Sequence, residues 1–152
     1  MSGRRALALI GGLDPTGGAG VLRDLWTAAA VAPELRAFAV ITAFTLQGRG
    51  APARALPRPW ARVAAEVAAL PKDAAIKVGA APAPVAAALA AALAARAGPV
   101  VIDPVLWASD GGALGDGAAA RALARAAALV TPNLPEAAAL AGARPDDPEL
   151  LT

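Results

Sequence analysis

The sequence predicts an α/β fold built on a doubly wound, mostly parallel sheet. Short apolar runs typical of strands alternate with helical stretches along all 152 residues. When each strand is followed by a helix, neighbouring strands run parallel and are joined by right-handed crossovers. Glycines and polar side chains also concentrate just after the predicted strands, where open α/β sheets bind their ligands. A chain of this length is expected to form one domain, residues 1–152.

The N-terminal half begins with two strand and helix units. Ala6–Ile10 is an apolar run that predicts a strand, and a glycine-rich turn separates it from a helix over Val21–Ala32. A second strand is expected at Arg36–Thr42. Pro59 then begins a helix with apolar residues at helical spacing, and Ala75–Val78 is the third strand.

The C-terminal half continues the alternation with three helices and two strands. These elements are helix Pro84–Ala97, strand Val100–Ile102, helix Ala118–Ala127, strand Leu129–Thr131 and helix Leu134–Leu140. Gly98 is expected to end the first of these helices at its C′ position, whereas Asn133 caps the last and Gly142 ends it. Residues 146–150 are typical of the opening of one more helix.

Composition excludes several classes of function. The chain has no cysteine and no histidine, which excludes disulfides, thiolate zinc sites and Ser-His triads. A net charge of +2 with scattered arginines argues against a nucleic-acid surface. No apolar span is long enough for a membrane helix, and the short run that stops at Asp14 is no export signal. A cytoplasmic protein with a small-molecule ligand is therefore expected.

The segment GGLDPTGGAG, residues 11–20, joins the first strand to the first helix. Backbone N–H groups at such a helix start suit an anion or the polar edge of a ring. It is not a Walker A motif, because Gly18 stands where the lysine would be, and G-x-G-x-x-G does not fit these glycines. The alternative is a glycine-rich turn without a ligand, in which Asp14 only starts the turn.

Four polar residues after the later strands are further candidates. Asp103 ends a buried strand, where a functional carboxylate competes with a simple loop cap. Asn133 and Glu136 share one side of a helix start, as a ligand pair or as a capping box. The Gln47 amide could read donor and acceptor positions on a heterocycle, although glutamine is also common in exposed loops.

Five segments together resemble a known family. They are GG-x-DPTGGAG, VITAFTLQGRG, IKVGA, VVIDPVLWASDGGAL and LVTPNLPEAAAL, and they occur in the order and spacing of hydroxymethylpyrimidine/phosphomethylpyrimidine kinases. This thiamine-pathway family is part of the ribokinase-like superfamily. The resemblance covers almost the whole chain and implies a ribokinase-like three-layer α/β/α sandwich with a mostly parallel sheet.

The resemblance also implies an activity and site residues. Gly12, Asp24 and Gln47 would hold the aminopyrimidine. The ATP phosphates would lie near Asp103, Asn133 and Glu136, with Mg²⁺ held by Asp103 and Glu136, in part through water. The reaction would be ATP-dependent phosphorylation of hydroxymethylpyrimidine and then of its monophosphate, in thiamine diphosphate biosynthesis.

The sequence departs from the family in its pocket and in its length. Leu13 replaces a small hydroxyl residue, and Ala80 and Ala81 replace Met-Leu. Lys77, in contrast, matches a frequent basic or polar position of the family and is expected to be structural. Family members continue beyond this length with a glycine-rich anion hole, the catalytic base and much of the nucleotide pocket. The resemblance therefore implies a C-terminally truncated fold with no catalytic residue in this chain.

Three interpretations of the shorter length are open. The chain could be an N-terminal fragment or half of a split kinase that needs a complementary C-terminal half or forms a homo-oligomer. It could be a non-catalytic pyrimidine-binding or regulatory module. It could also be a decayed remnant with no function of its own.

Overall fold

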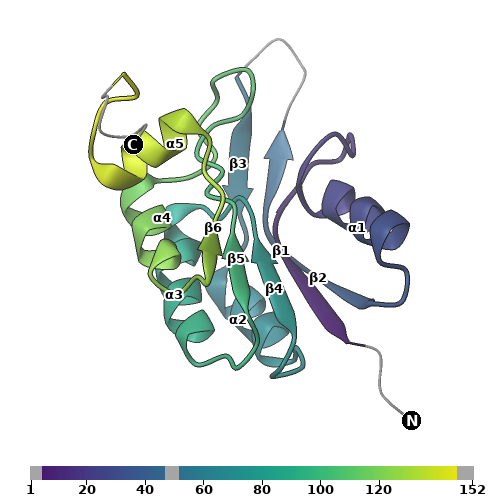
Figure 1. The fold of residues 1–152 in the computed structure, drawn as a ribbon. Coiled ribbons are helices and arrows are strands. Elements are labelled where there is room, and N and C mark those ends of the chain that lie inside the picture. The colour runs from purple at the N-terminus through teal and green to yellow at the C-terminus, as the bar shows by residue number, and fades with distance from the viewer. Residues whose placement is uncertain (1–4, 47–51, 147–152) are drawn as a thin grey trace.

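A computed structural model describes residues 5–46 and 52–146 (Figure 1). The strands are β1 (Ala6–Leu13), β2 (Arg36–Leu46), β3 (Arg54–Pro57), β4 (Ala75–Val78), β5 (Val100–Ile102) and β6 (Leu129–Val130). The helices are α1 (Gly20–Val31), α2 (Trp60–Ala68), α3 (Ala83–Ala94), α4 (Gly117–Ala124) and α5 (Leu134–Ala141).

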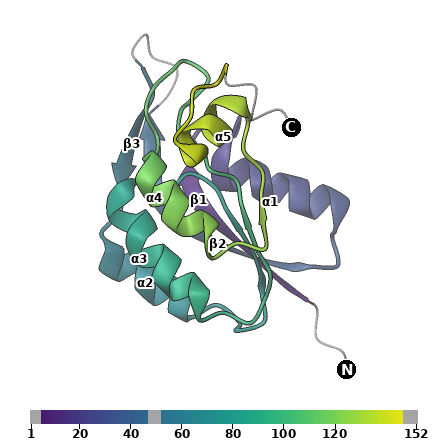
Figure 2. The same ribbon diagram turned by 60° about the vertical axis from the view of Figure 1, so that its left-hand side comes forward.

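The strands form one sheet in the order β3-β2-β1-β4-β5-β6. All pairs are parallel except β2 with β3, which is antiparallel. Figure 2 shows α2, α3 and α4 along one face of the sheet and α1 on the opposite face. The α/β class with a mostly parallel sheet, predicted from the sequence, is confirmed.

The main core lies between the sheet and α2, α3 and α4. Alternate strand residues such as Ile10, Ile76 and Ile102 point to this side, where they meet Leu89 and Leu93 of α3. All five side chains are at most 2% exposed. Burying one such side chain contributes about 1.5–3 kcal/mol, so this face supplies most of the apolar stabilisation.

Strand β3 is not among the strands predicted from the sequence. It pairs with the second half of β2, which therefore runs to Leu46 rather than ending at Thr42. Arg54–Pro57 ends in a proline, which removes a backbone donor and is tolerated because β3 is an edge strand. This pairing depends on a distant partner strand, which local sequence patterns do not reveal.

The predicted helix Pro84–Ala97 is wrong at its C-terminal end. The helix α3 ends at Ala94 with Ala95 as its C-cap, so Gly98 does not occupy the C′ position. Gly98 is instead required by a close approach, because a Cβ there would overlap the carbonyl oxygen of Ala74. The glycine allows the chain to pass the start of β4 before it enters β5.

The predicted ends of α5 are confirmed. Asn133 is its N-cap, and Gly142 closes it in the left-handed conformation at φ 73°. The helix opening predicted over 146–150 lies almost entirely outside the described residues. No helix in the described ranges has the length and apolar character needed to cross a membrane.

Candidate functional site

A cavity of about 250 Å³ lies where β1, β2, β4 and β5 end. Because parallel strands all point the same way, their carboxyl ends meet at this edge. Gly12 lies near the end of β1 and Asp14 follows this strand, Thr45 is the last residue but one of β2, and Asp103 follows β5. The cavity is thus built from the segments that the sequence analysis singled out.

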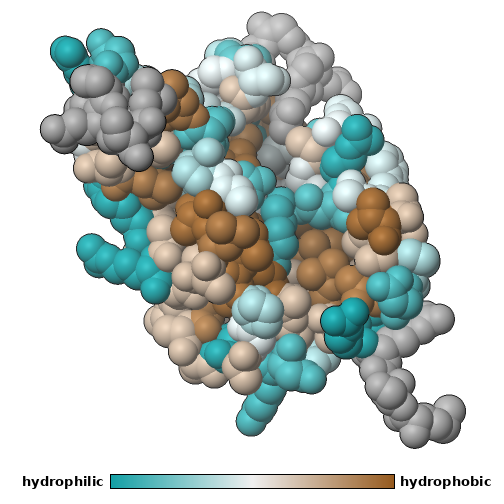
Figure 3. All heavy atoms as spheres, in the orientation of Figure 1, coloured by the Kyte–Doolittle hydropathy of each residue, from teal (hydrophilic) through white to brown (hydrophobic). Residues whose placement is uncertain are grey.

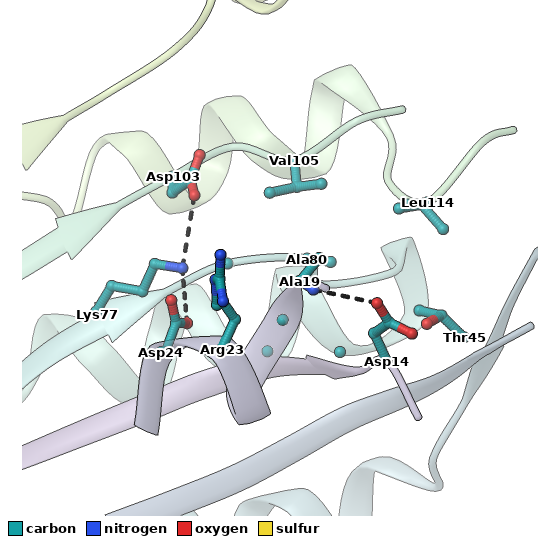
Figure 4. A pocket seen from close by; sticks show the side chains of 14 residues that line it. Asp14, Ala19, Arg23, Asp24, Thr45, Lys77, Ala80, Asp103, Val105 and Leu114 are labelled. Carbon is teal, nitrogen blue, oxygen red and sulfur yellow. Dashed lines mark hydrogen bonds and ion pairs between the residues drawn. The ribbon is translucent and has the colours of Figure 1, made fainter. Parts of the chain in front are cut away.

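The loop between β1 and α1 is organised by Asp14. Its carboxylate is 2% exposed and accepts backbone N–H groups of Thr16 at 2.9 Å and Ala19 at 3.1 Å. The Thr16 hydroxyl adds contacts of 2.8 Å to both carboxylate oxygens. Gly17 and Gly20 have φ of +72° and +63°, which a residue with a side chain rarely adopts. Asp14 therefore builds the turn that forms one wall of the cavity (Figure 4).

The bulge in β1 places Gly12 in the cavity wall. The register of β1 against β2 shifts between Gly11 and Gly12. A Cβ at Gly12 would lie 3.3 Å from Cγ2 of Thr45, so a larger residue would crowd the wall. Gly12 therefore lines the cavity, with Ala80 beside it. The small Ala80 side chain leaves this part of the cavity open.

Lys77 joins two of the predicted site residues. Its Nζ lies 2.8 Å from Oδ2 of Asp24 on α1 and 3.5 Å from Oδ2 of Asp103 after β5. The three side chains are 24–37% exposed and face one another across the cavity (Figure 4). A Cβ at Gly79 would lie 3.2 Å from this Nζ, so the glycine leaves room for the lysine.

Lys77 is expected from the sequence to be structural, but the structure also places it in the lining of the cavity. One signal pointed to it, because a lysine inside the short apolar strand Ala75–Val78 needs an acidic partner. The partner Asp24 could not be identified from the sequence, since it lies 53 residues away on another element.

Asn133 and Glu136 form a capping box at the start of α5. The Asn133 side chain accepts the N–H of Glu136 at 2.9 Å, and Oε2 of Glu136 accepts the N–H of Asn133 at 3.0 Å. Oε1 of Glu136 accepts the N–H of Leu106 at 3.3 Å, and this carboxylate is 4% exposed. The pair follows β6, next to β5, but neither residue is in the described lining of the cavity.

A direct magnesium site does not form from these side chains. Both oxygens of Glu136 accept backbone N–H groups, and Oδ2 of Asp103 faces Lys77. In the described ranges no group of three or more acidic side chains could hold a metal ion. The water-mediated Mg²⁺ contact of Asp103 and Glu136 stays a prediction.

Gln47, the third residue predicted to hold the pyrimidine, lies outside the described residues. The last described residue of β2 is Leu46, which is 57% exposed. Of the residues predicted to hold the pyrimidine, Gly12 and Asp24 therefore both line the cavity. Asp103, which is predicted to lie near the ATP phosphates, lines the same cavity.

Comparison with known proteins identifies one family model and several solved kinase structures that are similar to this chain. The family model described as phosphomethylpyrimidine kinase matches residues 14–151. A phosphomethylpyrimidine kinase structure from Clostridium difficile 630 is similar at a TM-score of 0.76 and 24% identity, over 97% of this chain and 67% of that one. A search of curated proteins found no match.

Two further solved structures are similar. One is described as the last common ancestor of HMPPK and PLK/HMPPK vitamin kinases, with TM-score 0.72 and 31% identity over 93% of this chain and 66% of that one. The other is an ADP complex of Bacillus subtilis pyridoxal kinase, with TM-score 0.77 and 26% identity over 99% of this chain and 58% of that one. The chain thus spans about two thirds or less of the length of these proteins.

Proposed function

The chain belongs to the phosphomethylpyrimidine kinase family, and from that membership we propose that it forms the pyrimidine-binding part of an ATP-dependent kinase. The substrate would be hydroxymethylpyrimidine and then its monophosphate, as in thiamine diphosphate biosynthesis. The observation that carries this proposal is the family match over residues 14–151 together with a cavity at the strand ends lined by Gly12 and Asp24.

The cavity suits a small polar ring. Its volume of about 250 Å³ is slightly below the usual range for ligand sites, which favours a single heterocycle. The Asp24 carboxylate can accept hydrogen bonds from an exocyclic amino group, while Lys77 offsets part of its charge. Gln47 would supply the amide that reads the ring edge, and Gly12 leaves space for the ring to approach the backbone.

The nucleotide would lie beside Asp103. The ADP complex of the similar Bacillus subtilis enzyme supports ATP as the phosphoryl donor. Asn133 and Glu136, at the next strand end, are proposed to face the ATP phosphates through the helix start that they cap. Because their side chains do not form a direct metal site with Asp103, no step of the reaction is assigned to magnesium.

Turnover by this chain alone is expected to be negligible. The sequence offers no candidate for the base or the anion hole of the family, and loss of such groups commonly costs a hundredfold or more. The chain spans 58–67% of the similar structures, so the remaining part of a family member could supply them. We therefore propose ligand binding by the chain itself and catalysis after complementation.

A coupled ADP-release assay tests this proposal, first on the chain alone and then with the C-terminal part of a family member. Calorimetry measures binding of hydroxymethylpyrimidine, its monophosphate and pyridoxal. Pyrimidine binding with turnover only after complementation is the expected result. Pyrimidine binding without turnover in either condition would favour the non-catalytic module, and binding of pyridoxal alone would contradict the pyrimidine assignment.

A further inference from the structure

The charged residues that line the cavity are almost all neutralised by one another or by the backbone. They are Asp14, Arg23, Asp24, Lys77 and Asp103. Asp14 accepts hydrogen bonds from its own loop. Lys77 lies within ion-pair distance of both Asp24 and Asp103, so its charge is shared between two carboxylates. This leaves one charged side chain to account for.

Arg23 is that side chain. It is the fourth residue of α1 and is exposed, and in the described part of the chain no ion pair or side-chain hydrogen bond involves its guanidinium. Figure 4 shows the side chain rising from α1 into the space between the Lys77 ion pairs and Ala19. The cavity therefore contains a cation that has no acidic partner among residues 5–46 and 52–146.

We propose that Arg23 binds a phosphate group of the ligand and gives the cavity a preference for phosphorylated compounds. The guanidinium presents a rigid fork of donors that matches phosphate oxygens, and such charge-assisted bonds are about twice as strong as neutral ones. Lys77 is less suited to this role, because a phosphate at its Nζ would also approach two carboxylates.

The inference rests on the proposed function for the identity of the ligand. The phosphate belongs either to the pyrimidine monophosphate, which is the substrate of the second phosphorylation, or to the nucleotide. Both share the chemistry that Arg23 recognises, and separate ligands distinguish them. If the phosphate is that of the pyrimidine, Arg23 discriminates between the substrates of the two steps.

The test compares Arg23→Gln with the wild-type chain by calorimetry at low salt. The ligands are hydroxymethylpyrimidine, its monophosphate and the ATP analogue AMP-PCP. Arg62→Gln is the matched control, because it removes the same charge from an exposed position on α2, on the other face of the sheet. Thermal unfolding of each variant checks that the fold is retained.

The expected result is a loss of about tenfold or more in affinity for one phosphorylated ligand, with the unphosphorylated pyrimidine and the Arg62→Gln control unchanged. The ligand whose affinity falls identifies the source of the phosphate. An equal loss of affinity in Arg23→Gln for the pyrimidine with and without its phosphate would overturn the inference. Unchanged affinities in this variant would overturn it as well, and so would failure of both phosphorylated ligands to bind the wild type. Absence of any pyrimidine binding, with AMP-PCP binding that depends on Arg23, would overturn only the proposed function.

Discussion

The two faces of the sheet differ in what covers them and in what their side chains do. On the face packed by α2, α3 and α4, Ile76 and Val78 of β4 lie in the apolar core at 2% and 0% exposure. On the opposite face Lys77 points toward Asp24 of α1. We call these the core face and the site face. One short strand thus contributes packing on one side and charged groups on the other, because successive strand residues alternate in direction.

The site face is also less completely covered. The helix α1 packs over β1 and β2, whereas Leu129 at the edge strand β6 is 56% exposed. Figure 3 shows hydrophobic patches over the strands on this side, next to α1 and separated by hydrophilic residues. Stability therefore rests chiefly on the core face, which leaves the site face available for ligands. Five predictions test this division.

The largest effect is expected from Leu89→Ala. Leu89 is fully buried between α3 and the sheet, so its truncation should leave a cavity and destabilise the chain by about 2–5 kcal/mol. Leu129→Ala is the matched control, with an expected change below about 0.5 kcal/mol because the side chain is already exposed. Urea unfolding measures both. Similar losses for the two variants would show that the faces do not differ.

Asp14→Ala should have the next largest effect on stability. Removing the carboxylate leaves the N–H groups of Thr16 and Ala19 without their acceptor, at a cost of about 1–3 kcal/mol. Pyrimidine affinity should fall as well, since the loop forms a wall of the cavity. Urea unfolding and calorimetry report the two effects. An unchanged unfolding midpoint would contradict the role of Asp14 in building the turn.

Gln47→Ala should weaken binding of the pyrimidine. We expect pyrimidine affinity to weaken by about 1–3 kcal/mol, because the ring would lose a polar hydrogen-bond partner. Calorimetry on the variant and the wild type decides this. If the wild type binds measurably and the variant binds equally well, Gln47 does not contact the pyrimidine.

Lys77→Met should remove the cation that links Asp24 and Asp103 on the site face. Its partners are partly solvated, so the loss of stability should stay below about 1 kcal/mol. Pyrimidine affinity should fall by about fivefold or more, since Asp24 and Asp103 would no longer share a cation that orients them. Lys77→Arg should retain part of the affinity. A large stability loss with normal affinity would indicate a structural role only.

The smallest effect concerns an ion pair remote from the cavity lining. Arg58 donates to both carboxylate oxygens of Glu66 at 2.7 and 2.8 Å, and these hydrogen bonds hold the pKa of Glu66 below its usual value of 4.5. The stabilisation is therefore present above about pH 4.5 and is lost as the pH falls through the lowered pKa. Glu66 is 41% exposed, so the loss should be below about 1 kcal/mol. Urea unfolding from pH 7 to pH 3 should show this dependence weakened in Glu66→Gln.

Much of the fold followed from local patterns. Alternating strand and helix periodicity predicted five of the six strands and the parallel pairing, because hydrophobic spacing is fixed within each segment. The capping box of Asn133 and Glu136 was one of the two interpretations considered, since N-cap chemistry involves residues only three positions apart. Asp103 is a candidate from its position at the end of a buried strand, whereas Gly12 and Asp24 are assigned from the family resemblance. All three line one cavity.

Only the tertiary structure decided which distant groups meet. In the folded chain Lys77 lies between Asp24 and Asp103. The Glu136 carboxylate accepts the N–H of Leu106, and Gly98 lies against the Ala74 carbonyl. The strand order also gives β2 an antiparallel partner in β3. These contacts join segments that are separated in the sequence by folded elements, and the hydrophobic period of each segment is the same whichever neighbour it pairs with. Local periodicity therefore determined the elements, whereas their packing determined the partners of the charged side chains.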